Sequence, residues 1–282
     1  MTGGVSLTVC SMLRPQSNLL SPMKIATWNV NSVKARIDTV TQWLKDAAPD
    51  VVCLQEIKCM DDAFPRGVFE DLGYNCAVHG QKTYNGVAIL SKRPIEDITC
   101  GLPNGEGDTH ARYIEAVVSG DKGVIRVASV YAPNGNPLGS EKFIYKLGWM
   151  ERLRDRAAEL LSYEEPAALM GDFNVIPTDD DCHDPAVWRN DALFQPQSQA
   201  ALRTIEHLGW QDAFRACDAR PHRYTFWDYQ AGSWQKDHGI RIDFVLLTPQ
   251  ATDRLKACTI DKRVRAWDKP SDHVPVVAEI DV

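Results

Sequence analysis

Short apolar runs alternate with longer amphipathic stretches along most of this chain. Residues 24–29 and 51–55 have the composition of β-strands, and the second run is apolar on both faces, as in a sheet covered on both sides. The stretch between them, residues 33–47, predicts a helix because its apolar side chains recur three or four residues apart. The alternation indicates an α/β domain built in layers.

The same pattern continues to the C-terminus. Helices are predicted over residues 141–161 and 197–208. The apolar stripe of the first of these helices consists of Phe143, Leu147, Met150, Leu153, Ala157 and Leu161. Further strands are predicted at residues 85–90, 114–118, 124–131, 167–170, 241–247 and 276–281. No tandem repeat or linker divides this pattern, so residues 23–282 are expected to form one domain.

Residues 1–22 differ in composition from the rest of the chain. They contain one Arg and no acidic residue, and their apolar run at residues 5–9 is too short and too polar for a signal peptide. We interpret this segment as a disordered N-terminal extension, or as the product of an upstream start codon.

The overall composition is that of a soluble globular protein, with 44% hydrophobic and 24% charged residues and no apolar run long enough to cross a bilayer. The eight cysteines form no CxxC pair, which favours reduced thiols in the cytoplasm. A net charge of −7 argues mildly against a nucleic-acid partner. It does not exclude one, because metal-bound carboxylates and a local basic face are both compatible with DNA binding.

Polar side chains follow several of the predicted strands directly, and loops on a rigid scaffold commonly carry function. These segments are residues 28–31 (WNVN), 54–58 (LQEIK), 131–133 (YAP), 171–174 (GDFN), 241–243 (RID) and 271–273 (SDH). The HExxH zinc motif, glycine-rich nucleotide loops and the GxSxG nucleophile motif do not occur in the sequence. The chemistry therefore depends on carboxylates, amides, a phenol and one histidine.

Two of these segments offer oxygen ligands to a metal ion. Glu56 leaves an apolar strand, and its carboxylate suits Mg²⁺, although the position also fits a surface residue in a first helical turn. Asp172 and Asn174 point the same way if their strand continues, so that one accepts a proton while the other donates to a phosphate oxygen. The alternative for this pair is an Asx turn that closes the strand.

The segment around His273 is expected to be a loop because Pro270 and Pro275 flank it. An imidazole beside the Asp272 carboxylate can stabilise charge that develops on a phosphate during attack. Such an imidazole needs a second acid to fix its tautomer, and Asp243, expected at the end of a strand, is available.

Together and in this order, the six segments resemble the exonuclease III family of AP endonucleases, within the endonuclease/exonuclease/phosphatase superfamily. The match runs from Met23 over nearly the whole chain and includes YAPNG at residues 131–135 and KPSDH at residues 269–273. The resemblance implies a four-layer α/β sandwich, in which two mixed β-sheets pack face to face with helices outside. It places the site at one edge of both sheets.

The resemblance also implies a metal site. Glu56 would be the principal ligand of Mg²⁺, for which Mn²⁺ can substitute. Asn29 and Asp272 would lie close to the metal, and Asp172 and Asn174 would complete its surroundings.

The catalytic residues implied by the resemblance surround the scissile phosphate. Asp172 would position or deprotonate the attacking water, or protonate the leaving 3′ oxygen. His273, oriented by Asp243, would contact the phosphate, and Asn174 and Tyr131 would complete its pocket.

The implied substrate is double-stranded DNA with abasic sites or 3′ ends. The resemblance predicts incision 5′ to an abasic site, with 3′–5′ exonuclease and 3′-phosphatase activity, by a monomer in the cytoplasm at the nucleoid. Phe226, Ile240 and Ile242 are the candidates for an apolar pocket around the flipped-out abasic sugar, and Trp227 is a weaker one.

Two other interpretations remain open. One is another phosphodiesterase or phosphatase of the superfamily, such as a non-specific DNase, a sphingomyelinase or an inositol-phosphate phosphatase. DNase-like members carry a second histidine where this chain has Tyr131, which disfavours that reading. The other is a catalytically silent DNA-binding relative, which would be expected to lose catalytic positions that this chain retains.

Overall fold

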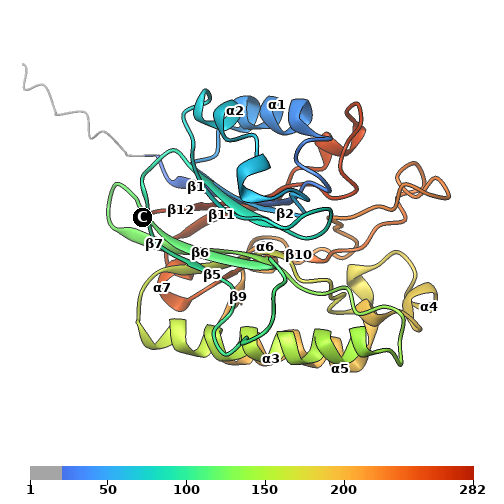
Figure 1. Cartoon of the computed structure of the whole chain (residues 1–282). Helices are drawn as coiled ribbons and strands as arrows, with labels where there is room; N and C mark the ends of the chain where they lie inside the picture. Colours follow the sequence, from blue (N-terminus) through green and yellow to red (C-terminus); the bar gives the residue numbers. More distant parts are fainter. Residues whose placement is uncertain (1–20) are drawn as a thin grey trace, which may run out of the picture.

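The computed structural model describes residues 21–282, so the predicted extension lies outside the described residues except for its last two. Two six-stranded sheets pack face to face in the middle of the molecule, with helices on both outer faces (Figure 1). The largest apolar cluster lies between the sheets and includes Ile25, Val51, Val127 and Met170, all fully buried. The predicted four-layer α/β sandwich is confirmed.

The first sheet has the strand order β11-β12-β1-β2-β4-β3. Within it β1 and β2 are parallel, and the other neighbours are antiparallel, so the sheet is mixed. Its strands in this order are Leu255–Ile260, Val276–Ile280, Met23–Asn29, Val51–Gln55, Val87–Ser91 and Asn75–His79.

The second sheet has the order β5-β6-β7-β8-β10-β9, and β7 and β8 form its parallel pair. A close approach between this pair requires glycine at position 171, where an added Cβ would lie 1.8 Å from the Val130 carbonyl oxygen. The strands in this order are Ile95–Cys100, Tyr113–Ser119, Val124–Tyr131, Ala167–Asp172, Asp243–Leu247 and Gln211–Asp212.

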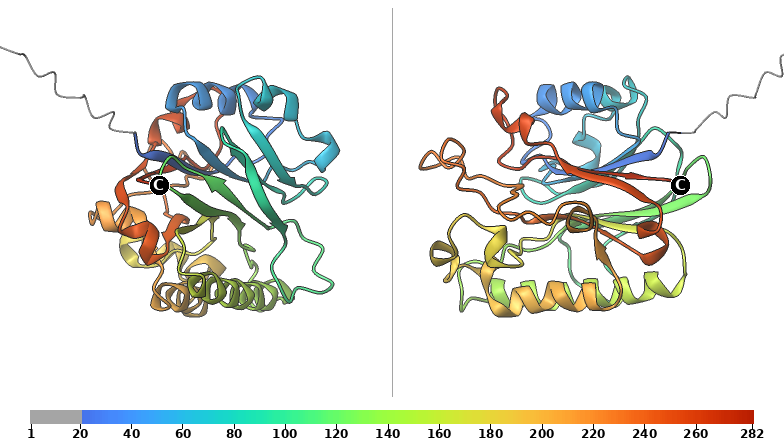
Figure 2. Two further views of the ribbon diagram at one scale, coloured as in Figure 1. Left: turned by 90° about the vertical axis from the view of Figure 1, so that its left-hand side faces the viewer. Right: turned by 180° about the vertical axis from the view of Figure 1, so that it is seen from behind.

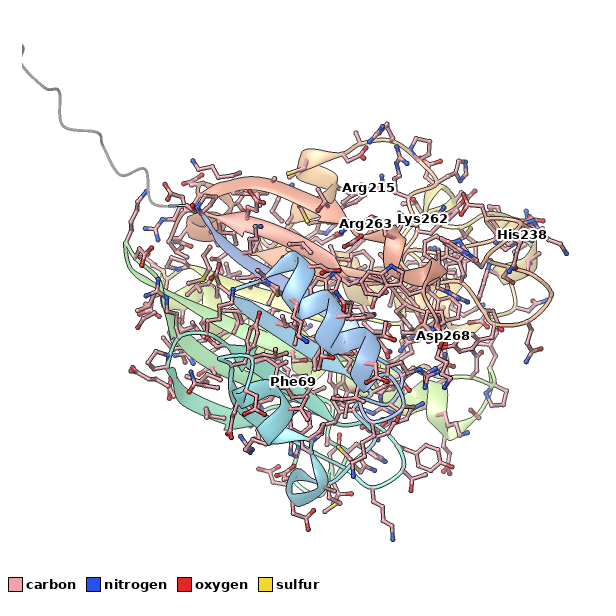
Figure 3. The ribbon with its side chains drawn as sticks, turned by 90° about the horizontal axis from the view of Figure 1, so that it is seen from above. Phe69, Arg215, His238, Lys262, Arg263 and Asp268 are labelled. Atoms are coloured by element: carbon pink, nitrogen blue, oxygen red, sulfur yellow. The ribbon has the colours of Figure 1, made fainter. Side chains whose placement is uncertain are left out.

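Helices α1 and α2 cover the first sheet, and α3 and α5 cover the second (Figure 1). Trp43 of α1 packs edge-on against Trp28 of β1, with 5.4 Å between ring centroids. Seen from above, α1 lies across its sheet, and His238 lies on a loop that projects beyond the sheet edge (Figure 3). The helices are Ile37–Ala47, Arg66–Glu70, Glu141–Ser162, Pro185–Trp188, Pro196–His207, Ala213–Cys217 and Pro249–Thr252 for α1 to α7.

Three predictions of local structure need correction. Helix α1 begins at Ile37 because residues 33–36 form turns before it. Asp243 begins β10, whereas the sequence pattern placed it at the end of a strand. The stripe of α3 is also rotated from the predicted one, because Trp149 and Leu160 are buried with Met150, Leu153 and Ala157. This rotation carries Lys146 into the interior.

Two further properties concern the whole described region. None of the helices within residues 21–282 combines the length and apolar character that crossing a membrane requires. All seven cysteines of this region are free thiols, and four of them are buried.

The predicted site segments meet at one end of the sandwich. β1, β2 and β8 end there, and β10 begins there. Long loops around residues 220–240 project from this end, opposite the C-terminus, in both the front and the rear view (Figures 1 and 2). The fold therefore gathers side chains from both sheets and from these loops.

Candidate active site

The candidate site lies where strands of both sheets end. The parallel strands β1 and β2 place Asn29 beside Glu56, which directly follows β2. In the second sheet, β7 and β8 pair Tyr131 with Asp172, and β10 places Asp243 opposite the same aspartate. Because the two sheets are stacked, these five positions converge.

Asn29 connects carboxylates from the two sheets. Its side-chain amide donates to Glu56 Oε1 at 2.9 Å and to Asp172 Oδ2 at 3.0 Å, and Asn29 is fully buried. One ligand atom from each of Glu56, Asp172 and His273 lies within 4.8 Å of the other two. The structure thus brings these four predicted residues together.

His273 is held at this centre by Asp243. Nδ1 of its ring lies 2.9 and 3.1 Å from the two Asp243 carboxylate oxygens, and Nε2 lies 3.8 Å from Asp172 Oδ2. Burial disfavours charge on the ring, but Asp243 and Asp172 outweigh this effect and raise the pKa of His273 to about 10. The ring is therefore a cation near neutral pH.

The two carboxyl groups of the cluster have opposite pKa shifts. Burial raises the pKa of Asp172 to about 7, with Asp243 acting in the same direction and the His273 cation against it. Burial also disfavours ionised Glu56, but Lys58 Nζ, 2.8 Å from Glu56 Oε2, outweighs this and holds the pKa of Glu56 below its usual value. Glu56 is the permanent anion, and Asp172 can exchange a proton near neutral pH.

Tyr131 lies beside the two carboxyl groups as a neutral phenol. Burial and the nearby Glu56 carboxylate raise the pKa of Tyr131 well above its ordinary value. The Arg112 guanidinium lies 4.7 Å from the centre of the ring and donates to the Tyr131 carbonyl oxygen at 3.3 Å. The Arg112 contacts fix the ring and oppose the rise in the pKa of Tyr131, but burial and the Glu56 carboxylate outweigh them and keep the hydroxyl protonated.

Asn174 reaches the site by a different route from the predicted one. The strand ends at Asp172, and Asn174 has a left-handed backbone with φ of 49°. Its backbone N–H donates to Asp172 Oδ1 at 2.9 Å, which is the Asx turn considered as the alternative. The Asn174 side chain donates to the Ala132 carbonyl oxygen at 2.9 Å, so the turn joins the loops that follow β7 and β8.

Asp272 lies outside the cluster and is connected to Glu56 through Asn31 and Lys58. Its Oδ1 accepts hydrogen bonds from Asn31 Nδ2 at 3.1 Å and from the Ser271 hydroxyl at 3.3 Å. Asn31 Oδ1 in turn accepts from Lys58 Nζ at 2.5 Å, and Lys58 pairs with Glu56. Sequence reasoning assigned no role to Asn31 or Lys58, although both belong to the WNVN and LQEIK segments that it singled out.

The predicted apolar pocket is largely closed. Ile240 and Ile242 are 0% and 2% exposed and form a small cluster with Ile176, Cys182 and Leu193. Phe226 is half-buried, with its ring centroid 4.9 Å from that of His273. Trp227, the weaker candidate, is also fully buried and packs with Tyr224 and Trp234 in the apolar cluster beneath the helices of the first sheet.

The donor set of the cluster fits a hard divalent cation. Two carboxylates from different sheets face each other, and Mg²⁺ in proteins typically takes one or two carboxylates and keeps several waters. Two ionised carboxylates this close repel each other unless a cation or a shared proton lies between them. Glu56 and Asp172 are the residues that would hold such an ion, with Asn29 beside them.

Comparison with known proteins agrees with this geometry. The model of the endonuclease/exonuclease/phosphatase family matches residues 26–273. An exodeoxyribonuclease III from Haemophilus influenzae is 31% identical over 265 residues, which cover 91% of this chain and 99% of that protein. An exodeoxyribonuclease from Bacillus subtilis is 30% identical over 92% of this chain and its own full length.

Solved structures give the same result. An AP endonuclease from Archaeoglobus fulgidus superposes with a TM-score of 0.87 at 38% identity, and a 3′–5′ exonuclease from Neisseria meningitidis with 0.88 at 39%. Each comparison covers 92% of this chain and 100% of the other. The predicted class, a hydrolytic nuclease, is confirmed. This chain belongs to the endonuclease/exonuclease/phosphatase family.

Proposed function

We propose that this protein is a Mg²⁺-dependent DNA-repair nuclease that cleaves 5′ to abasic sites and processes 3′ ends as an exonuclease and phosphatase. Its substrate is double-stranded DNA, and Mn²⁺ substitutes for Mg²⁺. The protein works as a monomer in the cytoplasm at the nucleoid. The names of its relatives support the substrate class, since they include a DNA repair nuclease and a 3′ phosphatase bound to a DNA hairpin.

One observation carries the proposal. Glu56, Asp172 and the His273–Asp243 pair converge within a few ångströms, although they come from two sheets and a C-terminal loop. A cation-binding pair of carboxylates beside a protonated imidazole is suited to phosphodiester hydrolysis, which depends mainly on positioning and charge neutralisation.

Each side chain has a distinct part in the proposed reaction. When bound at Glu56, the metal ion supplies positive charge to the phosphate oxygens. His273 donates from Nε2 to a non-bridging phosphate oxygen, while Asp243 keeps the ring charged and oriented. Asp172, with a pKa near neutrality, takes a proton from the attacking water or returns one to the leaving 3′ oxygen. Tyr131 donates its hydroxyl hydrogen to the same phosphate.

The closed apolar cluster bears on substrate preference. An abasic sugar that is flipped out reaches Ile240 and Ile242 only after neighbouring side chains move, because both isoleucines are buried. A terminal 3′-phosphate requires no such opening. This difference favours 3′-end processing as the stronger of the proposed activities.

Product analysis tests the proposal. Three end-labelled duplexes would carry an abasic site, a nick or a 3′-phosphate, and each would be incubated with Mg²⁺, with Mn²⁺ and with EDTA. We expect EDTA-sensitive cleavage of damaged or terminal substrates, loss of cleavage in His273→Asn, weaker cleavage in Glu56→Gln at limiting Mg²⁺, and little internal cleavage of undamaged duplex. Cleavage that persists in EDTA, or internal cleavage of undamaged duplex equal to incision at the abasic site, would refute it.

A further inference from the structure

Lys146 is fully buried on a helix whose other charged residues mostly face solvent. Its Nζ donates to the backbone carbonyl oxygen of Asn134 at 3.1 Å and to that of Asn174. Among the described residues, no carboxylate lies within 4.0 Å of this nitrogen, so Lys146 forms no salt bridge. Burying a lysine without an ionic partner is costly in free energy, and the hydrogen bonds to the two carbonyl groups offset part of this cost.

These two carbonyl groups belong to different loops of the site. Asn134 lies in the loop after β7, whose last residue is Tyr131, and Asn174 lies in the turn after β8, whose last residue is Asp172. The side chains of Asn134 and Asn174 also meet, with 3.4 Å between Nδ2 and Oδ1. Lys146 therefore lies beneath the junction of the two loops and is bonded to both.

The stem of Lys146 is enclosed as closely as its amine. Gly135 has φ of +90°, and a Cβ at this position would lie 2.6 Å from Lys146 Cδ. The loop after β7 thus closes over the lysine only because residue 135 is glycine. This close packing limits the positions that the loop can take while Lys146 is present.

We infer that Lys146 is a positioning residue, which clamps the loops after β7 and β8 so that Asp172, Asn174 and Tyr131 keep their relative places. Lys146 itself does not touch the substrate. The inference rests on the proposed function for its catalytic consequence, but the clamp is a property of the protein alone. A lysine amine has at least two N–H donors in either protonation state, so both carbonyl groups are satisfied throughout.

Lys146→Met tests the clamp because methionine fills a similar volume and cannot donate. The matched control is Leu160→Ala, which opens a cavity on the same helix 14 residues away, about 21 Å along its axis. For cleavage of the abasic or 3′-phosphate duplex at saturating Mg²⁺, we expect Lys146→Met to lower kcat by at least about tenfold. KM should change by less than about threefold, and Leu160→Ala should keep kcat within about twofold of wild type.

Amide hydrogen exchange provides a readout that does not depend on activity. Without added metal, the backbone amides of residues 132–136 and 172–176 should exchange faster in Lys146→Met than in wild type. In Leu160→Ala their exchange rates should equal those of wild type. A kcat of Lys146→Met within twofold of wild type, or equal loss in both variants, would overturn the clamp. If Lys146→Met does not fold, Lys146→Leu, which likewise has no side-chain donor, is judged by the same criteria. A wild-type protein without EDTA-sensitive cleavage would refute the proposed function instead, and the exchange experiment would still decide on the clamp.

Discussion

Nδ1 of His273 lies 2.9 Å from Oδ2 of Asp243, although the two residues are 30 positions apart in the chain. β10 presents Asp243 at its first residue, and the loop before β12 carries His273 to it. Trp28 fixes this loop from β1 by donating its indole N–H to the His273 carbonyl oxygen at 3.1 Å. The imidazole is therefore held by side chains from both sheets.

The His273–Asp243 pair predicts a defect in chemistry when Asp243 is changed to Asn. The amide removes the charge that keeps the ring protonated, so kcat should fall by about 10²–10⁴-fold. DNA affinity should change little, because Asp243 is buried and does not face the substrate. Single-turnover cleavage and a binding titration separate the two effects. Asp253→Asn, at an exposed position directly after α7, is the control and should behave as wild type.

Glu56→Gln is expected to raise the Mg²⁺ concentration required for half-maximal activity by at least about tenfold. The substitution preserves shape but removes the charge that pairs with Lys58 and faces Asp172. A Mg²⁺ titration of the cleavage rate measures the shift, with the exposed Glu70→Gln as the control. An unchanged Mg²⁺ requirement would show that Glu56 is not a metal ligand.

Phe226→Ala should lower the preference for abasic over intact duplex by about three- to tenfold, since one apolar contact of this size contributes about 1 kcal/mol or somewhat more to selectivity. Phe226 is the only one of the three pocket candidates that is not fully buried, and it packs against His273. The ratio of kcat/KM for the two substrates is the measurement. A constant ratio would show that the pocket assignment is wrong.

Asp181→Asn is expected to lower stability in a pH-dependent way. Burial acts against the Asp181 carboxylate, but Arg241 at 2.7 Å and Arg215 at 2.6 Å outweigh it and lower the pKa. A carboxyl group with a lowered folded pKa stabilises the fold above its unfolded pKa of about 3.9 and loses this contribution as pH falls through the folded value.

The expected loss for Asp181→Asn is about 1.5–3 kcal/mol at pH 6, because the substitution removes one of the two carboxylates that pair with buried Arg241 and the one that pairs with Arg215, while Asp212 still pairs with Arg241. The difference from wild type should shrink as pH falls below about 4, where the unfolded chain takes up a proton at Asp181 before the folded protein does. Urea unfolding between pH 3 and pH 7 measures it. A difference that is constant over this range would contradict the ionic explanation.

The strands that sequence patterns missed share one property. β11, β3, β5 and β9 are the four edge strands of the two sheets. β5, for example, buries none of its six residues fully. Edge strands contact solvent on one side, so their composition resembles that of loops, and pairing with the neighbouring strand is what orders them. Most of the central strands, such as β2, β4 and β10, bury both faces, and the central strands were predicted from their apolar runs.

The candidate site shows the same division. Glu56, Asp172, Asn174 and Asp243 could be singled out because they lie at ends of apolar strands, and His273 because it lies beside Asp272 in a segment flanked by prolines. Their grouping required the resemblance to a known family. The buried Lys146 and the isoleucines of the closed cluster could not be foreseen, since a helical period does not specify how the helix is rotated on its sheet.

The sequence alone determined which chemical groups the protein has available and that most of them follow strands, because side-chain periodicity is a local property of the chain. Only the tertiary structure decided which of these groups meet. Because the two sheets are stacked, Glu56 and Asp172 both accept hydrogen bonds from the Asn29 side-chain amide. The rotation of α3 places Lys146 beneath the loops after β7 and β8. Such contacts join residues far apart in sequence, and their geometry follows from how whole layers pack rather than from any local pattern.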